Sequence, residues 1–237
     1  MPRMGTKQRE EYKTLKAVFD LFTEKNLFKL ISQGYFEGLE SPISIGKEAN
    51  IFTARTKDGT RLVIKIYRLS VCDFNKMYSC IRTDSRFSSL KRSRRDVIFA
   101  WAQREYRNLL KAREAGVNVP TPIVFLFNIL VMDCVGGENI AHRLKDSPPK
   151  NPKKFFDEIV KNMRLLHKSG FVHGDLSPFN ILNDDETPVF IDMSQSTSLD
   201  NTNAKEYLLR DVKNVCDFFR KQGLKISDQD ILKKITV

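Results

Sequence analysis

The chain has 237 residues, of which 41% are hydrophobic and 29% charged, a composition that excludes wholesale disorder and collagen-like or coiled-coil chains. Its length suits one large domain or two small lobes. Forty Lys and Arg against 29 Asp and Glu give a net charge of +11, which favours polyanionic partners such as nucleic acid, nucleotides or acidic proteins. The longest apolar stretch, residues 122–132, falls short of the about 20 residues that span a membrane, and the N-terminus is too charged for a secretory signal. We therefore expect a cytoplasmic protein without a membrane partner.

The first part of the chain predicts a helix followed by antiparallel strands. Apolar residues recur at helical spacing over 9–33. Strands are then predicted over 43–45, 50–56 and 61–67, and Asp58-Gly59 between the last two is a hairpin signal.

A basic stretch separates these strands from a long helix. Residues 70–95 show weak periodicity and many more basic than acidic side chains, so they are expected to form a mobile insertion. Asp96 is the expected cap of a helix over 96–115. Two further strands are predicted over 123–126 and 129–133.

The remaining chain turns helical after a joint at Gly136-Gly137. Asn151-Pro152 is the expected start of a helix that runs to Gly170, because proline suits the first helical position. Two short strands are expected over 181–183 and 189–192. Closing helices are predicted over 204–220 and 228–234.

These elements predict an α+β fold with a small strand-rich lobe, a hinge and a helical lobe. The expected division is an N-terminal helical extension over 1–40, an N-lobe over 41–133 that includes the insertion at 70–95, and a hinge with the C-lobe over 134–237.

Polar residues gather within apolar surroundings between a predicted helix and a predicted strand. Asp175 and Asn180 lie in this loop after His173, and Asp192 follows at the end of a buried strand. A buried ionised Asp is costly unless it is paired, hydrogen-bonded or bound to a metal. The three oxygen-bearing side chains therefore indicate one site, of a kind that suits Mg²⁺ shared with a phosphate substrate.

The spacing from Asp175 to Asn180 matches the catalytic loop of protein kinases, in which the Asp receives the hydroxyl proton and the Asn holds a metal ion. The alternative is that Asp175 caps a turn and Asn180 occupies a left-handed position. The presence of His173 before the pair and Asp192 after it favours the catalytic interpretation.

A lysine in the third strand supplies the other half of the expected site. Lys65 lies in the apolar run VIKIY, where it must find an anion, and Glu105 in the long helix is the best partner. The alternative is an edge-strand lysine that extends to water. The turn over 44–49 contains one glycine, so neither G-x-G-x-x-G nor a Walker A motif is present, and only its position makes a phosphate-binding turn plausible.

The segments in chain order resemble the RIO family of atypical protein kinases, most closely the RIO-one subgroup. The match covers about residues 27–223, and the few residues before the first strand imply a minimal, archaeal-type form without the winged helix of the RIO-two subgroup. The matching segments are IGKEANIF, VIKIYR, TDSRF, WAQREYRNL, VPTPI with NILVMD, HGDLSPFNIL, IDMSQS and EYLLRDVKNVCDFF.

The resemblance implies a role for each matching residue. Asp175 becomes the catalytic Asp, while Asn180 and Asp192 become ligands of Mg²⁺ or Mn²⁺, with transient phosphorylation of Asp192 also allowed. Lys65 contacts ATP phosphates and pairs with Glu105. The phosphate loop comprises Ser44, Ile45, Gly46, Lys47, Glu48 and Ala49, and the adenine site comprises Met132, Asp133 and Val135.

The sequence also departs from the subgroup pattern. Gly174 and Pro178-Phe179 stand where the subgroup usually has Ala and Glu-Tyr, and Asn201-Thr202 stands where a His-Pro pair is usual. These departures leave the identity of the acceptor substrate open, and they bear less on ATP binding.

The resemblance implies a serine protein kinase or ATPase that acts in maturation of the small ribosomal subunit, with the subunit precursor and its rRNA as partners. Alternatives are a small archaeal tRNA-modification-complex kinase, a small-molecule phosphotransferase of the aminoglycoside-kinase type, and a nucleotide-gated ribosome-binding module. We also expect Arg92, Arg94 and Arg95 of the basic insertion to bind RNA, against the alternative of a solvated surface.

Overall fold

A five-stranded antiparallel sheet forms the core of the N-terminal half in the computed structural model, which describes residues 19–70 and 72–237. The predicted hairpin turn at Asp58-Gly59 joins the second and third strands, and the two strands expected after the long helix join the same sheet. In spatial order the strands are β1 (Leu39–Ile45), β2 (Ala49–Arg55), β3 (Arg61–Tyr67), β5 (Ile129–Asp133) and β4 (Pro122–Leu126).

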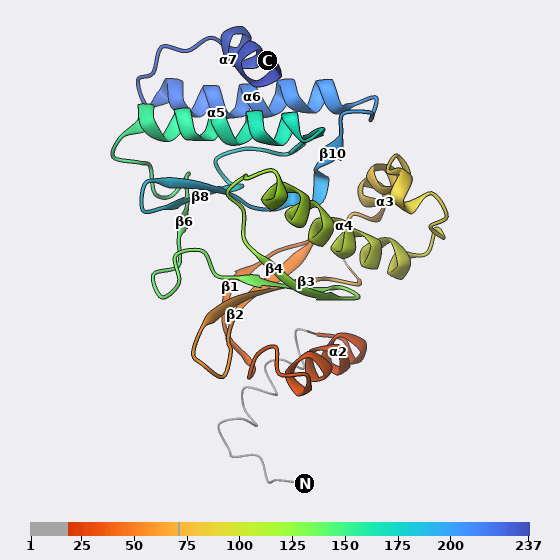
Figure 1. Cartoon of the computed structure of the whole chain (residues 1–237). Helices are drawn as coiled ribbons and strands as arrows, with labels where there is room; N and C mark the ends of the chain where they lie inside the picture. Colours follow the sequence, from red (N-terminus) through yellow and green to blue (C-terminus); the bar gives the residue numbers. More distant parts are fainter. Residues whose placement is uncertain (1–18, 71) are drawn as a thin grey trace.

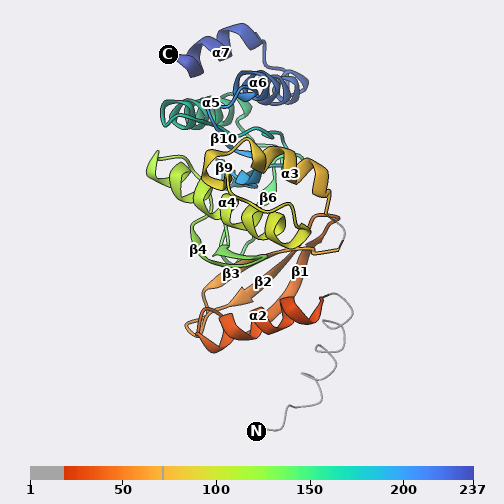
Figure 2. The same cartoon turned by 90° about the vertical axis from the view of Figure 1, so that its right-hand side faces the viewer.

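Helix α2 (Leu21–Ser32) covers the outer face of this sheet (Figure 1, Figure 2). The carboxylate of Asp20 caps it by accepting the backbone N–H groups of Phe22 and Thr23, both at 3.0 Å. The part of the helix predicted over 9–33 that precedes residue 19 lies outside the described residues.

Alternation along the central strands divides their side chains between two cores. Ile64 and Val131 belong to the core that α2 covers, whereas Leu130 and Met132 belong to the core shared with the C-terminal half. Because successive strand residues point to opposite faces, Lys65 lies on the face opposite Ile64. The lysine is therefore directed away from α2 and toward the interior of the molecule.

The segment between β3 and the long helix, predicted to be a mobile insertion over 70–95, contains regular structure. Met77 and Ile81, one helical turn apart, are buried against the long helix. A nine-residue helix offers only these two core positions, too few to produce a clear periodic signal. The elements here are α3 (Phe74–Arg82), the 3-10 turn η1 (Ser85–Phe87) and α4 (Arg94–Glu114).

Helix α4 begins two residues earlier than predicted, because Ser93 and not Asp96 is its cap. The Ser93 hydroxyl oxygen accepts the N–H of Asp96 at 3.2 Å and donates to the Asp96 carboxylate at 2.6 Å. This reciprocal pair uses both side chains at the helix start. The helix then runs between the sheet and the C-terminal half (Figure 1).

The two glycines after β5 form a hydrogen-bonded turn. A Cβ atom on Gly136 would lie 2.3 Å from the carbonyl oxygen of Asn139, so the turn requires glycine at this position. Short strands follow, in two small sheets: β6 (His142–Arg143), β7 (Phe171–Val172), β8 (Ile181–Asp184), β9 (Thr187–Phe190) and β10 (Thr197–Ser198).

Three helices close the C-terminal half at the end opposite α2 (Figure 1). The predicted cap Asn151 accepts the N–H of Lys154 at 3.1 Å, with proline at the first helical position. No helix within residues 19–70 and 72–237 combines the length and apolar character that a membrane crossing needs. The helices are α5 (Pro152–Lys168), α6 (Ala204–Lys221) and α7 (Asp228–Thr236).

Candidate active site

A cavity of about 820 Å³ lies between the five-stranded sheet and the C-terminal half. Its wall comes from β1, β3, the segment after β5, and β8, so residues far apart in sequence meet there. The predicted site residues that line it are Ser44, Lys65, Glu105, Met132, Asp133, Val135, Asn180 and Asp192. The lining residues do not include Ile45, Gly46, Lys47, Glu48, Ala49 or Asp175.

The ammonium group of Lys65 lies between two carboxylates in this cavity. Its Nζ is 2.8 Å from Oε1 of Glu105 and 3.1 Å from Oδ1 of Asp192. Burial opposes the charge, but the two carboxylates outweigh it and raise the pKa of Lys65. The side chain is 8% exposed, so the alternative of a lysine extended to water is wrong.

Glu105 is held from two sides. Its second carboxylate oxygen accepts a hydrogen bond from the Tyr67 hydroxyl, while Lys65 occupies the first. Burial raises the pKa of Glu105 and the Lys65 ammonium opposes this rise. Tyr67 was not predicted as a site residue, although its position two residues after Lys65 places both side chains on one face of β3.

Asp192 occupies a left-handed backbone conformation, with φ 60°, just after β9. Its side chain is 39% exposed, and Oδ1 also accepts the hydroxyl of Ser194 at 2.7 Å. Burial opposes ionisation, but Lys65 and Ser194 hold the pKa of Asp192 at about 2. An ionised carboxylate in a strained conformation next to a lysine is an arrangement typical of a functional site.

Asp175 lies beside this pair and is held by two amides. Asn180 Nδ2 donates to the Asp175 carbonyl at 2.8 Å and to Oδ2 at 3.3 Å, and Gln195 Nε2 donates to Oδ2 at 3.0 Å. Among the described residues, none donates to the other oxygen, Oδ1. Burial and the charge of Asp192 raise the pKa of Asp175. Oδ1 is thus the atom that can take up a proton.

The imidazole of His173 fixes the backbone on both sides of the site. Its Nε2 is 3.1 Å from the carbonyl oxygen of Ile191, and Nδ1 accepts the N–H of Asp175 at 3.3 Å. These contacts require a neutral ring with the hydrogen on Nε2. Burial accordingly lowers the pKa of His173 to about 4.

Asp211 on α6 supports the same loop, and it was not predicted from the sequence as a site residue. Its two carboxylate oxygens accept the N–H groups of Gly174 and Leu176, both at 2.8 Å. Burial raises the pKa of Asp211 to about 7. Gly174, which replaces the alanine usual in the resembling subgroup, has φ 82°, and its Cβ would lie 2.8 Å from the Gln195 carbonyl.

Helix α4 holds the segment after Asp192. Asn108 Nδ2 donates to the carbonyls of Met193 at 2.8 Å and Ser196 at 2.9 Å. Arg86 in η1 donates to Asn108 Oδ1 at 2.9 Å and pairs with Asp84 at 2.6 Å. The TDSRF segment of the insertion is therefore joined to the site through α4.

Asn180 and Asp192 could hold a divalent cation together. Asn180 donates through its amide nitrogen, which leaves its amide oxygen for a metal, and Asp192 offers an ionised carboxylate. Two hard oxygen ligands that leave other positions to phosphate and water fit Mg²⁺. No group of three or more His, Cys, Asp and Glu in the described part of the chain could form an all-protein cage.

The predicted phosphate turn connects β1 and β2. The N–H of Gly46 donates to the Ala49 carbonyl at 3.1 Å, and a Cβ on Gly46 would lie 2.9 Å from that oxygen. Arg68 contacts the turn through the carbonyls of Gly46 and Glu48. The single glycine is thus needed for the turn itself.

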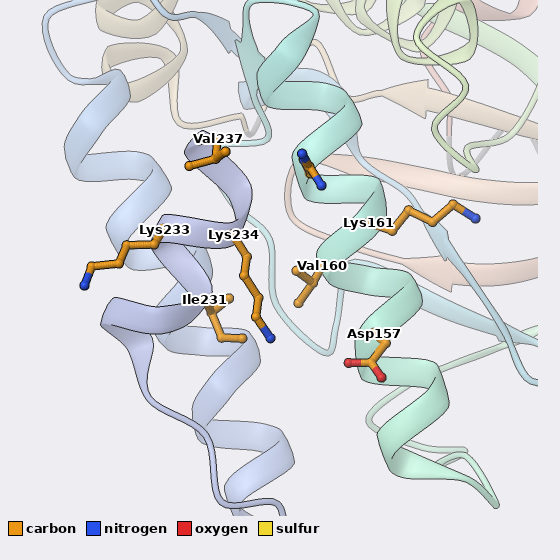
Figure 3. A pocket seen from close by; sticks show the side chains of 8 residues that line it. Asp157, Val160, Lys161, Ile231, Lys233, Lys234 and Val237 are labelled. Atoms are coloured by element: carbon orange, nitrogen blue, oxygen red, sulfur yellow. The ribbon is translucent and has the colours of Figure 1, made fainter.

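A second pocket, of about 560 Å³, lies between α5 and α7 (Figure 3). Val160 and Ile231 contribute apolar wall, whereas Lys161 and Lys233 point away on opposite sides. It contains none of the predicted site residues, eight of which line the larger cavity.

The two-part fold, the buried lysine–glutamate pair and the loop carrying Asp175 and Asn180 define the class of a protein-kinase-like phosphotransferase. The family model described as "RIO domain" matches residues 50–232. The chain therefore belongs to the RIO family, whose Rio1 members are RIO-type serine/threonine-protein kinases.

Relatives and solved structures agree with this assignment. The chain is 37% identical over 235 residues to a RIO-type serine/threonine-protein kinase Rio1 of Haloferax volcanii, covering 99% of this chain and 81% of the relative. It is 41% identical over 229 residues to the Rio1 kinase of Methanocaldococcus jannaschii, covering 96% and 78%. A crystal structure of a Rio2 kinase–ADP/Mg²⁺–phosphoaspartate complex from Chaetomium thermophilum is similar with a TM-score of 0.68 and 27% identity. That match covers 89% of this chain but 65% of the Rio2 chain, just under two thirds of its length.

Proposed function

We propose that the chain transfers the γ-phosphoryl group of Mg-ATP to a serine or threonine hydroxyl, or to water. The observation that carries this proposal is the Lys65 ammonium between Glu105 and Asp192 in the 820 Å³ cavity. Lys65 would contact phosphate oxygens, and Asn180 and Asp192 would hold Mg²⁺ or Mn²⁺, which neutralises phosphate charge when bound. Met132, Asp133 and Val135 would border the adenine, and the turn over 44–49 would cover the phosphates.

Asp175 would receive the proton of the attacking hydroxyl at Oδ1. Asn180 and Gln195 fix the opposite oxygen, so the carboxylate is oriented before the acceptor arrives. The Rio2 structure is described as a phosphoaspartate complex, which supports an ATPase variant of the proposal with transient phosphorylation of Asp192.

We further propose a cytoplasmic role in maturation of the small ribosomal subunit, with the particle precursor and its rRNA as partners. The family resemblance and the net charge of +11 support it. Family membership disfavours the tRNA-modification-complex kinase and the small-molecule phosphotransferase. Turnover measured with and without pre-ribosomal particles would distinguish an enzyme from a ribosome-binding module with incidental transfer activity.

We also propose that the chain is divided into an N-terminal extension over 1–40, an N-lobe over 41–133 and a hinge with the C-lobe over 134–237.

The test of the site uses two substitutions that separate binding from transfer. Asp192→Ala should weaken metal-dependent nucleotide binding in titration calorimetry, because it removes a ligand and a partner of Lys65. Asp175→Asn should keep nucleotide affinity but lower phosphoryl transfer by about 100-fold or more, because it removes the proton acceptor at little change in volume. Asp157→Asn on the exposed face of α5 is the matched control. Wild-type turnover by the Asp175→Asn protein would overturn the assignment.

A further inference from the structure

An exposed aromatic side chain lies in the loop that carries Asp175 and Asn180. Phe179 is 49% exposed, although it directly precedes Asn180, the proposed metal ligand. Its ring belongs to none of the three apolar cores formed by the described residues. A single exposed apolar side chain is common on protein surfaces, so it is the position of Phe179 next to Asn180, rather than its exposure, that bears on function.

A lysine lies over this ring. The Nζ of Lys145 is 4.6 Å from the centroid of Phe179, and its backbone N–H donates to the Pro178 carbonyl at 3.1 Å. The segment after β6 is thereby fixed against the catalytic loop, and the ammonium group and the ring form one surface. We call Phe179 and Lys145 the rim pair.

The rim pair adjoins the cavity of the proposed active site. Arg143 and Asp146, on either side of Lys145 in the chain, both line that cavity, as does Asn180 next to Phe179. Phe179 directly precedes Asn180 in the chain, and Asn180 Nδ2 contacts Asp175, the proposed proton acceptor. This position makes the rim pair a candidate contact for a chain whose hydroxyl approaches Asp175.

The charges around Asp175 itself are balanced. Lys76 on α3 and Arg210 on α6 act on its carboxylate as nearby positive charges, and Asp192 and Glu48 act as opposing acids. At the rim itself, Lys145 and Arg143 outnumber Asp146. An acceptor with acidic side chains would be attracted here, and one with basic side chains repelled.

We propose that the rim pair binds the residues flanking the acceptor hydroxyl and selects protein segments with an acidic side chain beside the serine or threonine and an apolar side chain next to it. The ring would contact the apolar side chain, and the Lys145 ammonium would pair with the acid. This inference rests on the proposed function, since it names the acceptor of the same reaction. A polypeptide is the expected occupant because the acceptor of a serine/threonine kinase carries its own flanking residues over the rim.

The step that this surface serves is ordinary phosphoryl transfer. The acceptor oxygen forms a bond to the γ-phosphorus while the bond from that phosphorus to the bridging oxygen breaks, and its electron pair leaves with ADP. The hydroxyl proton passes to Asp175 Oδ1. The rim pair takes no part in bond making and acts only on acceptor affinity and choice.

The test compares two synthetic serine peptides that differ only in their flanking charge, one with Asp and Leu beside the serine and one with Lys and Leu. The full chain with Mg-ATP should phosphorylate the acidic peptide with the higher kcat/KM. Lys145→Glu should shift the ratio of kcat/KM values toward the basic peptide by about fivefold, which is the upper value for one surface ion pair. Phe179→Ala should raise KM for both peptides with little change in kcat.

The matched control is Lys154→Glu, the same charge reversal at an exposed lysine of α5 that does not line the cavity. Its kcat/KM ratio should equal that of the unmodified chain. An unchanged ratio in Lys145→Glu overturns the inference. So does a wild-type chain that hydrolyses ATP but phosphorylates neither peptide, an outcome that leaves the proposed function intact. Oligouridylate that binds through Phe179, with peptide kinetics indifferent to Phe179→Ala, would assign the surface to nucleic acid and also overturn it. Failure of the proposed function itself would show as absent ATP turnover and nucleotide binding that does not depend on Asp192.

Discussion

Acidification should destabilise the folded chain through His173. The buried ring is neutral because Nδ1 accepts the Asp175 N–H and Nε2 donates to the Ile191 carbonyl. A proton on Nδ1 would face that N–H group, and burial already lowers the pKa of His173 from 6.5 to about 4. Between these two values the unfolded chain binds a proton that the folded chain does not. The contribution of His173 to stability is therefore fully present above about pH 6.5 and is lost as the pH drops toward 4.

The size of this effect follows from the two pKa values. Their difference corresponds to about 3 kcal/mol when fully expressed, and to about 2 kcal/mol between pH 7 and pH 5. For a chain of this length, about 2 kcal/mol lowers the melting temperature by roughly 4–8 °C.

The assay is urea unfolding at pH 7 and pH 5 for the unmodified chain and for His173→Asn. The variant loses packing and a hydrogen bond at both pH values, so only the difference between its two unfolding free energies is informative. That difference should be smaller than in the unmodified chain by about 2 kcal/mol, while His142→Asn, at an exposed histidine, should leave it unchanged. Equal pH dependence in the His173→Asn and unmodified proteins would refute the account of a neutral, buried imidazole.

Two further variants address the insertion. Asp84→Ala should lower the free energy of unfolding by about 3 kcal/mol in urea titrations, because Arg104, 2% exposed and 3.2 Å from Asp84, would keep a buried charge without its acid; a loss below about 1 kcal/mol would contradict this. Replacing Arg92, Arg94 and Arg95 together by Ala should weaken binding of ribosomal RNA while ATP affinity is retained. The slope of log affinity against log salt concentration should become less steep by up to about three, because up to three phosphate contacts are removed. Unaltered RNA affinity and salt slope in that triple variant would show that the cluster is solvated surface. The structure already gives the three side chains another role, because they lie over the rings of Tyr78, Phe74 and Phe22.

The sequence predicts the fold best where a periodic pattern is long. Alternation over β3 and β2 and the helical spacing of α5 and α6 give elements within one or two residues of those observed. The catalytic-loop spacing and the kinase resemblance also indicate that Lys65, Asp175 and Asp192 belong together, and the structure brings Lys65 and Asp192 to 3.1 Å. A short helix such as α3 gives no comparable signal because two turns bury only two side chains.

The supports of the site were harder to predict because they depend on segments that meet only in the folded chain. Gln195 reaches Asp175 from the segment after Asp192, and Asp211 reaches Gly174 across 37 residues. Asp211 did leave a signal, since it interrupts the apolar stripe of α6 next to Val212, where a lone carboxylate needs a partner. No such signal marked the choice of Gln195.

The anchoring of the Asp192 segment by Asn108 limits which inhibitors can bind this chain. For the segment from Met193 to Ser196 to leave its buried position, both hydrogen bonds from Asn108 must break, and each buried polar group left without a partner costs about 1–3 kcal/mol. A compound that needs the space occupied by Met193 would lose much of its affinity to that rearrangement. Compounds that fill the cavity as it stands, against Met132 and the segment after β5, meet no such cost. Selective ligands for this chain are therefore best sought among those that leave the Asp192 segment in place.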